Sequence, residues 1–187
     1  MMNTHGFFYW EYDKAADCLT LCSDTTQRKI RTALKGEVLT QSAFISCDCE
    51  ADEFMFYTQI MELLEYCDLV APEKREFLAY TAVAARTFLL PTQPKSWFFE
   101  AMDNAATALP EECPYLVQTR VKQNQRIISL LLLASDGNVA DCLLLEDELS
   151  LPGLCLQFGQ PLRIFNNRLQ HLAASEHSTS FWQQQIA

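Results

Sequence analysis

The residues best suited to metal or redox chemistry are the cysteines. Eight are present, and two pairs stand close together, Cys47 with Cys49 and Cys18 with Cys22. Thiolates are good zinc ligands, but no Cys-x-x-Cys occurs and the three histidines stand near the chain ends at no ligand spacing. We therefore predict no metal site, and a zinc or thiol sensor using Cys47 and Cys49 is a weaker alternative.

Glycine spacing argues against nucleotide chemistry. The chain has only five glycines, and the closest two, Gly153 and Gly159, stand six residues apart. Phosphate-binding loops and dinucleotide fingerprints need several glycines within one short loop, so that backbone N–H groups approach the phosphates. The acidic runs, such as Glu146-Asp147-Glu148, are typical of solvated loops. We predict no catalytic residues and no cofactor.

The positive charges are few and clustered. Arg28, Lys29, Arg31 and Lys35 hold four of the fourteen within eight residues. Arg120, Lys122 and Arg126 form a second group around an expected turn. Either these are solvated surfaces of mixed sign, or they form positive patches that orient an acidic protein partner.

Lys95-Ser96-Trp97-Phe98 joins a positive charge to large aromatic side chains just after a pair of prolines. Tryptophan is a favoured anchor of protein interfaces, although a tryptophan in a strand is more often part of the core. Because a helix end beside a new sheet is a common place for a pocket, we interpret Lys95 and Trp97 as candidate contacts.

The N-terminal elements expected to position these residues are of mixed type. Phe7–Tyr12 and Asp17–Cys22 are predicted to form a strand hairpin, and Thr25 to Leu34 a third strand. Phe54–Tyr57 fits either a strand or the start of a helix running to Cys67, because a short apolar run is compatible with both.

The clearest predicted element is a helix from Pro72 to about Leu89. Pro72 suits the first helical position, and a broad apolar stripe follows at helical spacing. Pro91 and Pro94 prevent the helix from continuing.

Beyond Pro94 the apolar pattern changes to short strands. Ser135-Asp136-Gly137-Asn138 predicts a hairpin turn between two leucine-rich runs, because Asp-Gly readily supplies positive φ. The predicted strands are Ser96–Phe99, Tyr115–Val121, Arg126–Ala134, Val139–Glu146, Leu154–Gln157 and Leu162–Phe165.

The sequence therefore predicts an α+β fold with two small domains. An N-terminal α/β domain is expected over residues 1–93, and a mostly antiparallel, β-barrel-like domain over 94–172. Residues 173–187 are rich in Ser, Thr, His and Gln and are expected to form a flexible tail.

Composition limits the classes of partner. Of 187 residues, 49% are hydrophobic and 20% are charged, and the net charge is −10. This acidity disfavours nucleic acid and anionic membranes, which need a basic face. The longest apolar run, Ile127 to Ala134, is too short to span a membrane, and no secretory signal is visible. We expect a cytoplasmic protein with reduced thiols that binds a protein or a small molecule.

Five short segments carry a family resemblance when taken in chain order: Trp10–Asp13, Leu39–Phe44, Pro94–Phe98, Cys142–Leu144 and Phe165–Leu169. Together they resemble the ZapC cell-division proteins of Gammaproteobacteria. The resemblance covers about Phe7 to Leu172, and Pro94-Lys95-Ser96-Trp97-Phe98 contributes most to it.

This resemblance implies a cytoplasmic protein at the midcell division site that is not an enzyme. It implies binding to the tubulin-like GTPase FtsZ, lateral bundling of FtsZ protofilaments, a stabilised ring and lower FtsZ GTPase activity. It also implies an α/β domain followed by a β-barrel-like domain, with a pocket in each. By position, Leu21 and Lys95 match the N-terminal pocket region, whereas Leu90 stands where the family has a basic residue.

Two hypotheses of different classes follow. The first is an FtsZ-bundling interaction protein, and the alternative is a small-ligand-binding or enzymatic protein that uses an interdomain pocket. Bundling needs two attachment points, so it requires either a dimer or two sites on one monomer, and the oligomeric state stays open. The candidate partner-binding residues are Leu21, Lys95, Trp97, Arg28, Lys29 and Arg31.

Overall fold

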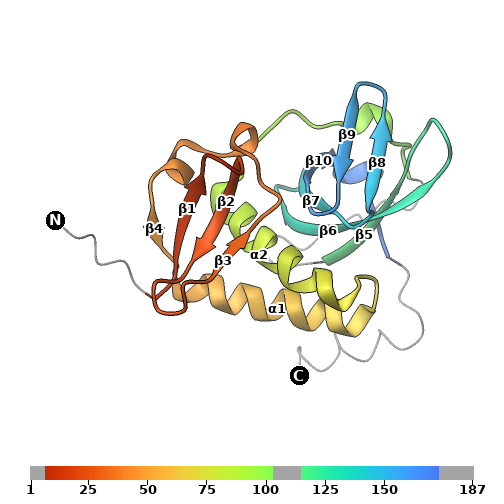
Figure 1. Cartoon of the computed structure of the whole chain (residues 1–187). Coiled ribbons are helices and arrows are strands. Elements are labelled where there is room, and N and C mark those ends of the chain that lie inside the picture. The colour runs from red at the N-terminus through yellow and green to blue at the C-terminus, as the bar shows by residue number, and fades with distance from the viewer. Residues whose placement is uncertain (1–6, 103–114, 173–187) are drawn as a thin grey trace.

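The computed structural model describes residues 7–102 and 115–172. In this part of the chain, two helices and a small sheet form the N-terminal half, and a larger sheet with a separate hairpin forms the C-terminal half (Figure 1). No helix of the described residues is long and apolar enough to cross a membrane. The expected tail, 173–187, lies outside the described residues.

The N-terminal sheet is antiparallel, with strand order β3-β2-β1-β4. The predicted hairpin is confirmed as β1 and β2, but the third strand is much shorter than Thr25 to Leu34. A tight turn occupies its first part, since Gln27 adopts a φ of 55° and the Ser23 N–H donates to the Arg28 carbonyl at 3.0 Å. The strands are β1 (Tyr9–Asp13), β2 (Cys18–Cys22), β3 (Lys29–Arg31) and β4 (Cys47–Asp48).

Two helices pack against one face of this sheet. The ambiguous segment around Phe54 is helical and belongs to α1 (Ala51–Cys67), which begins with a reciprocal capping box between Glu50 and Glu53. The predicted proline-led helix is confirmed as α2 (Pro72–Phe88).

The C-terminal sheet has five antiparallel strands in the order β10-β7-β6-β5-β11, and β8 and β9 pair as a separate hairpin. The predicted α+β class with antiparallel sheets is confirmed, but within the described residues the larger sheet stays open and does not close into a barrel. The strands are β5 (Tyr115–Arg120), β6 (Ile127–Ser135), β7 (Val139–Leu144), β8 (Glu148–Leu151), β9 (Leu154–Gln157), β10 (Pro161–Phe165) and β11 (Gln170–His171).

Two strand predictions in this half are wrong. Ser96–Phe98 forms a 3-10 turn and not a strand, because the N–H groups of Phe98 and Phe99 donate back to the carbonyls of Lys95 and Ser96. The strand expected over Val139–Glu146 ends at Leu144. The Glu146 carboxylate there accepts the Ser129 N–H at 3.1 Å, and the unpredicted strand β8 follows.

β6 separates two hydrophobic cores. Leu131 and Leu133 belong to the core that contains α1 and α2, whereas Leu130 and Leu132 belong to a second core beneath the β8–β9 hairpin. Successive side chains of a strand point to opposite faces, so burial of both faces explains a continuous run of leucines. The first core therefore includes residues on both sides of the predicted 93/94 boundary.

Candidate functional site

The predicted basic cluster lies on and beside β3, and each of its three candidate residues has an acidic partner. Arg28 donates to both oxygens of Glu76 on α2, at 2.9 and 2.7 Å. Two looser ion pairs of 3.8 Å cross the sheet, from Lys29 to Glu11 and from Arg31 to Asp13. Arg28, Lys29 and Arg31 therefore form a charge ladder of mixed sign and not an uncompensated positive patch.

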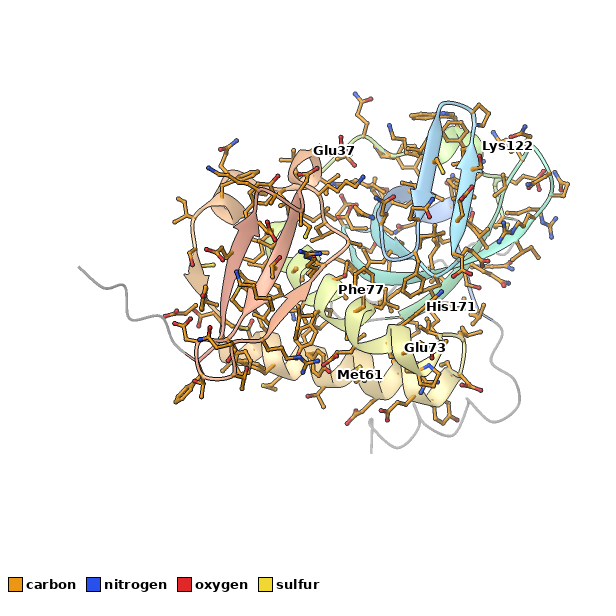
Figure 2. All side chains as sticks on the ribbon, in the orientation of Figure 1. Glu37, Met61, Glu73, Phe77, Lys122 and His171 are labelled. Atoms are coloured by element: carbon orange, nitrogen blue, oxygen red, sulfur yellow. The ribbon has the colours of Figure 1, made fainter. Side chains whose placement is uncertain are left out.

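A cavity of about 460 Å³ adjoins this ladder. Phe77 of α2 lines it, and the Phe77 ring stacks on Phe158 of the C-terminal half with centroids 6.1 Å apart. Figure 2 labels Phe77 on α2, between β3 and the larger sheet. The cavity is therefore formed by the N-terminal half, and only its Phe77 wall also contacts the C-terminal half. Its lining residues are Asp13, Thr20, Arg28, Lys29, Ile30, Arg31 and Phe77.

Leu21 is placed behind this surface and not on it. Its side chain is 2% exposed and belongs to the first core, and its backbone pairs with Ile30 across β2 and β3. In this structure Leu21 supports β3 from within and is not accessible to a partner.

Lys95 and Trp97 form a cation–π pair in which the ring is exposed and the lysine is half-buried. The Lys95 ammonium lies 5.3 Å from the centroid of the Trp97 ring, and Trp97 is 55% exposed. No carboxylate in the described part of the chain forms an ion pair with Lys95. An ammonium over an exposed indole can bind a carboxylate while the ring covers an apolar group.

The backbone fixes this pair against β10. The Lys95 N–H donates to the Arg163 carbonyl at 2.8 Å, and the Phe165 N–H donates to Ser96 Oγ at 2.8 Å. The Arg168 guanidinium also donates to the Phe99 carbonyl at 3.2 Å. Two segments of the family resemblance, Pro94–Phe98 and Phe165–Leu169, are therefore neighbours in space, although sequence spacing gave no sign of it.

Two of the three residues in the second basic group are also paired. Arg120 lies 3.8 Å from Glu100, and Arg126 lies 2.7 Å from Glu146.

A cavity of about 670 Å³ lies beyond the turn after β5 and is lined by Gln123, Asn124, Ser150, Leu151 and Pro152. Leu90 is exposed, and its N–H donates to the Val38 carbonyl at 2.8 Å.

The seven cysteines among the described residues are free thiols. Burial, reinforced by nearby Glu53, raises the pKa of both Cys47 and Cys49 above the ordinary thiol value. Within residues 7–102 and 115–172, no group of three or more His, Cys, Asp and Glu side chains is placed to hold a metal ion.

Comparison with known proteins bears on the family. Residues 91–175 match the family described as cell-division protein ZapC, C-terminal. The chain is 32% identical to cell division protein ZapC of Musicola paradisiaca, over 87% of this chain and 84% of that protein. The chain belongs to the ZapC family. The ZapC of Aliivibrio salmonicida is 30% identical over 90% of this chain and 92% of its own, and that of Proteus mirabilis is 28% identical over 83% of each. The family resemblance found in the sequence is therefore confirmed, and these relatives are named as cell-division proteins and not as enzymes.

Proposed function

We propose that this member of the ZapC family is a cytoplasmic, non-enzymatic accessory protein that binds FtsZ at the midcell division site. In this proposal it promotes lateral bundling of FtsZ protofilaments, stabilises the ring and lowers FtsZ GTPase activity. Family membership supports the division role, and the Lys95–Trp97 pair supports a protein-binding surface.

The pair carries the argument because no carboxylate in residues 7–102 and 115–172 forms an ion pair with Lys95. The protein has a net charge of −10, yet among the described residues the Lys95 ammonium lies over an aromatic ring and not beside a carboxylate. A carboxylate of an acidic partner could approach Lys95 without displacing any described carboxylate, whereas at Arg28 it would have to displace Glu76. The backbone bonds to β10 hold the pair in place before binding, which lowers the entropy lost on association.

The charge ladder on β3 is a second candidate contact. Its two cross-sheet ion pairs are exposed, so a partner carboxylate can replace Glu11 or Asp13 at little cost. Lys29 and Arg31 thus belong to the proposed binding surface as exchangeable charges, and Leu21 belongs to it as a supporting residue. Two separate surfaces on one chain would satisfy the need for two attachment points.

The alternative function is binding of a small molecule in the cavity beside Phe77, which residues of the N-terminal half line. The cavity of about 460 Å³ favours it, because positive side chains and the Phe77 ring line the same space. A small anion with an apolar group would suit that lining.

The deciding experiment is co-sedimentation of the purified protein with FtsZ polymerised by GTP. We expect more FtsZ in the low-speed pellet as the protein concentration rises, together with slower GTP hydrolysis. FtsZ with GDP, which does not polymerise, is the control. An unchanged pellet and unchanged hydrolysis over the full concentration series would contradict the proposed function.

A further inference from the structure

β3 is an outer strand of the N-terminal sheet, and no strand of the described residues pairs with its outer edge. Arg28, Ile30 and Thr32 turn their peptide groups toward β2, as the bonds from Ser23 N–H to Arg28 and from Thr32 N–H to Leu19 show. Peptide groups alternate in direction along an antiparallel strand, so those of Lys29 and Arg31 point away from β2. No segment of the described chain hydrogen-bonds to these outward groups.

The surroundings of this edge are open, and the two residues whose peptide groups point outward carry positive side chains that are only loosely paired with carboxylates. Lys29 and Arg31 are exposed, and every residue of β3 lines the cavity of about 460 Å³. The Lys29 and Arg31 side chains lie on the outer face of the sheet, where they meet Glu11 and Asp13. Ile30 points to the opposite face and, with Phe77, gives the cavity an apolar side.

We propose that the β3 edge binds an extended acidic peptide segment by strand addition. The main chain of the peptide would pair with the outward N–H and C=O groups of Lys29 and Arg31. Its alternate residues would be Asp or Glu, placed across from the Lys29 and Arg31 side chains, because opposite charges on neighbouring strands attract. The residue between them would be apolar and would enter the cavity beside Phe77.

The existing contacts are compatible with this mode of binding. The Lys29–Glu11 and Arg31–Asp13 pairs are 3.8 Å long and exchange readily with carboxylates of the peptide. The closer Arg28–Glu76 pair fixes the start of β3 to α2 and keeps the edge in position. This inference rests on the proposed function only for the source of the peptide, a division partner; the binding mode follows from β3.

The probe is a capped synthetic hexapeptide that alternates glutamate and valine, titrated into the full chain and followed by NMR. We expect the amide signals of Lys29 and Arg31 to shift and their hydrogen exchange to slow. Two further peptides carry a methyl group on every second backbone nitrogen, one on the odd and one on the even positions. Each keeps all side chains but loses half of the backbone N–H donors. One of them should bind about tenfold more weakly than the unmethylated peptide, as expected for the loss of one or two hydrogen bonds.

Two variants of Lys29 separate backbone pairing from charge attraction. Lys29→Pro removes the outward N–H, which takes no part in the sheet, whereas Lys29→Gln removes only the charge. We expect Lys29→Pro to bind the hexapeptide more weakly than Lys29→Gln. Strand addition would be overturned if the two variants bound the hexapeptide equally well. It would also be overturned if both methylated peptides bound as tightly as the unmethylated one. If Lys29→Pro does not fold, the methylated peptides alone decide the question. Peptide binding without FtsZ pelleting would contradict only the proposed function.

Discussion

Trp10 and Glu53 are hydrogen-bonded to one another inside the protein, 43 residues apart, with the indole Nε1–H donating to Oε1 at 3.1 Å. The same carboxylate accepts the Thr87 hydroxyl at 3.2 Å and the Glu50 N–H at 2.8 Å. Glu53 is only 8% exposed. One side chain thereby joins β1, α1 and α2, which fixes the helices beneath the sheet that carries the charge ladder.

Replacing this carboxylate should destabilise the fold. Glu53→Ala leaves the buried Trp10 N–H without its acceptor and removes the capping box of α1, so we expect the free energy of unfolding to fall by about 3 kcal/mol. Urea denaturation measures this change. The exposed neighbour Asp52 is the control, since Asp52→Ala should change stability by less than about 0.5 kcal/mol. Equal effects of the two substitutions would show that Glu53 is not a structural centre.

Charge reversal at Lys95 tests the proposed binding surface. Lys95→Glu should reduce FtsZ pelleting by about tenfold or more, because a carboxylate of the partner would then meet a like charge. Circular dichroism and the melting temperature should stay close to wild type, since Lys95 has no ion pair to lose within the described residues. Lys14→Glu, at an exposed turn, is the matched control. If Lys95→Glu pellets FtsZ as wild type does, the contact lies elsewhere.

Gly159 tests the junction of the two halves. Its φ is +79°, and an added Cβ would lie 3.1 Å from the Phe77 ring and 3.2 Å from the Ala33 Cβ. Gly153 has a similar φ of +75° but no atom within 4 Å of the added Cβ. Gly159→Ala should therefore cost about 1–3 kcal/mol more stability than Gly153→Ala, because only the first adds overpacking to backbone strain. Thermal unfolding of the two variants measures the difference in stability. Equal losses of stability would mean that Phe77 and Ala33 move aside at little cost.

Stability should decline at alkaline pH. Burial raises the pKa of Cys67 above the ordinary thiol value and raises the pKa of Tyr80 to about 12. Between the unfolded and folded pKa values the folded state holds more protons, so the free energy of unfolding falls as pH rises. We expect a constant value near pH 7–8 and a decline from about pH 9, near the ordinary thiol pKa.

Urea denaturation at a series of pH values tests this decline. Cys67→Ala should make it shallower between about pH 9 and 10, because one raised thiol is removed. If the free energy of unfolding stayed constant up to about pH 11, which is above the ordinary pKa of tyrosine, the raised pKa values of Cys67 and Tyr80 would be contradicted.

Local chemistry made parts of this fold predictable from the sequence. Pro72 and the apolar stripe behind it defined α2, and Asp136-Gly137 defined the turn between β6 and β7. The 3-10 turn of Ser96–Phe98 was not predicted, because its aromatic residues favour strands. The turn depends on the hydrogen bond between Lys95 and β10, which no local pattern reveals.

The candidate site was less predictable, for a related reason. Arg28 and Glu76 are 48 residues apart, so the neutralisation of the basic cluster becomes visible only when α2 lies beside β3. The burial of Leu21 likewise depends on helices that the alternation of β2 does not reveal. The exposure of Trp97 follows from the position of its turn at the margin of the larger sheet, which no local pattern specifies.

Because β6 is buried on both faces, the two halves of the protein stay attached through its side chains as well as through the chain itself. A protease that cuts the exposed stretch between Pro91 and Lys95 breaks the chain, yet the fragments would stay associated, because Leu131 and Leu133 remain embedded among α1 and α2. Such a nicked protein should elute as one particle and separate only when denatured. A large-to-small substitution at a leucine on one face of β6 would also weaken the packing on its other face. The sequence of this strand is therefore constrained by both cores.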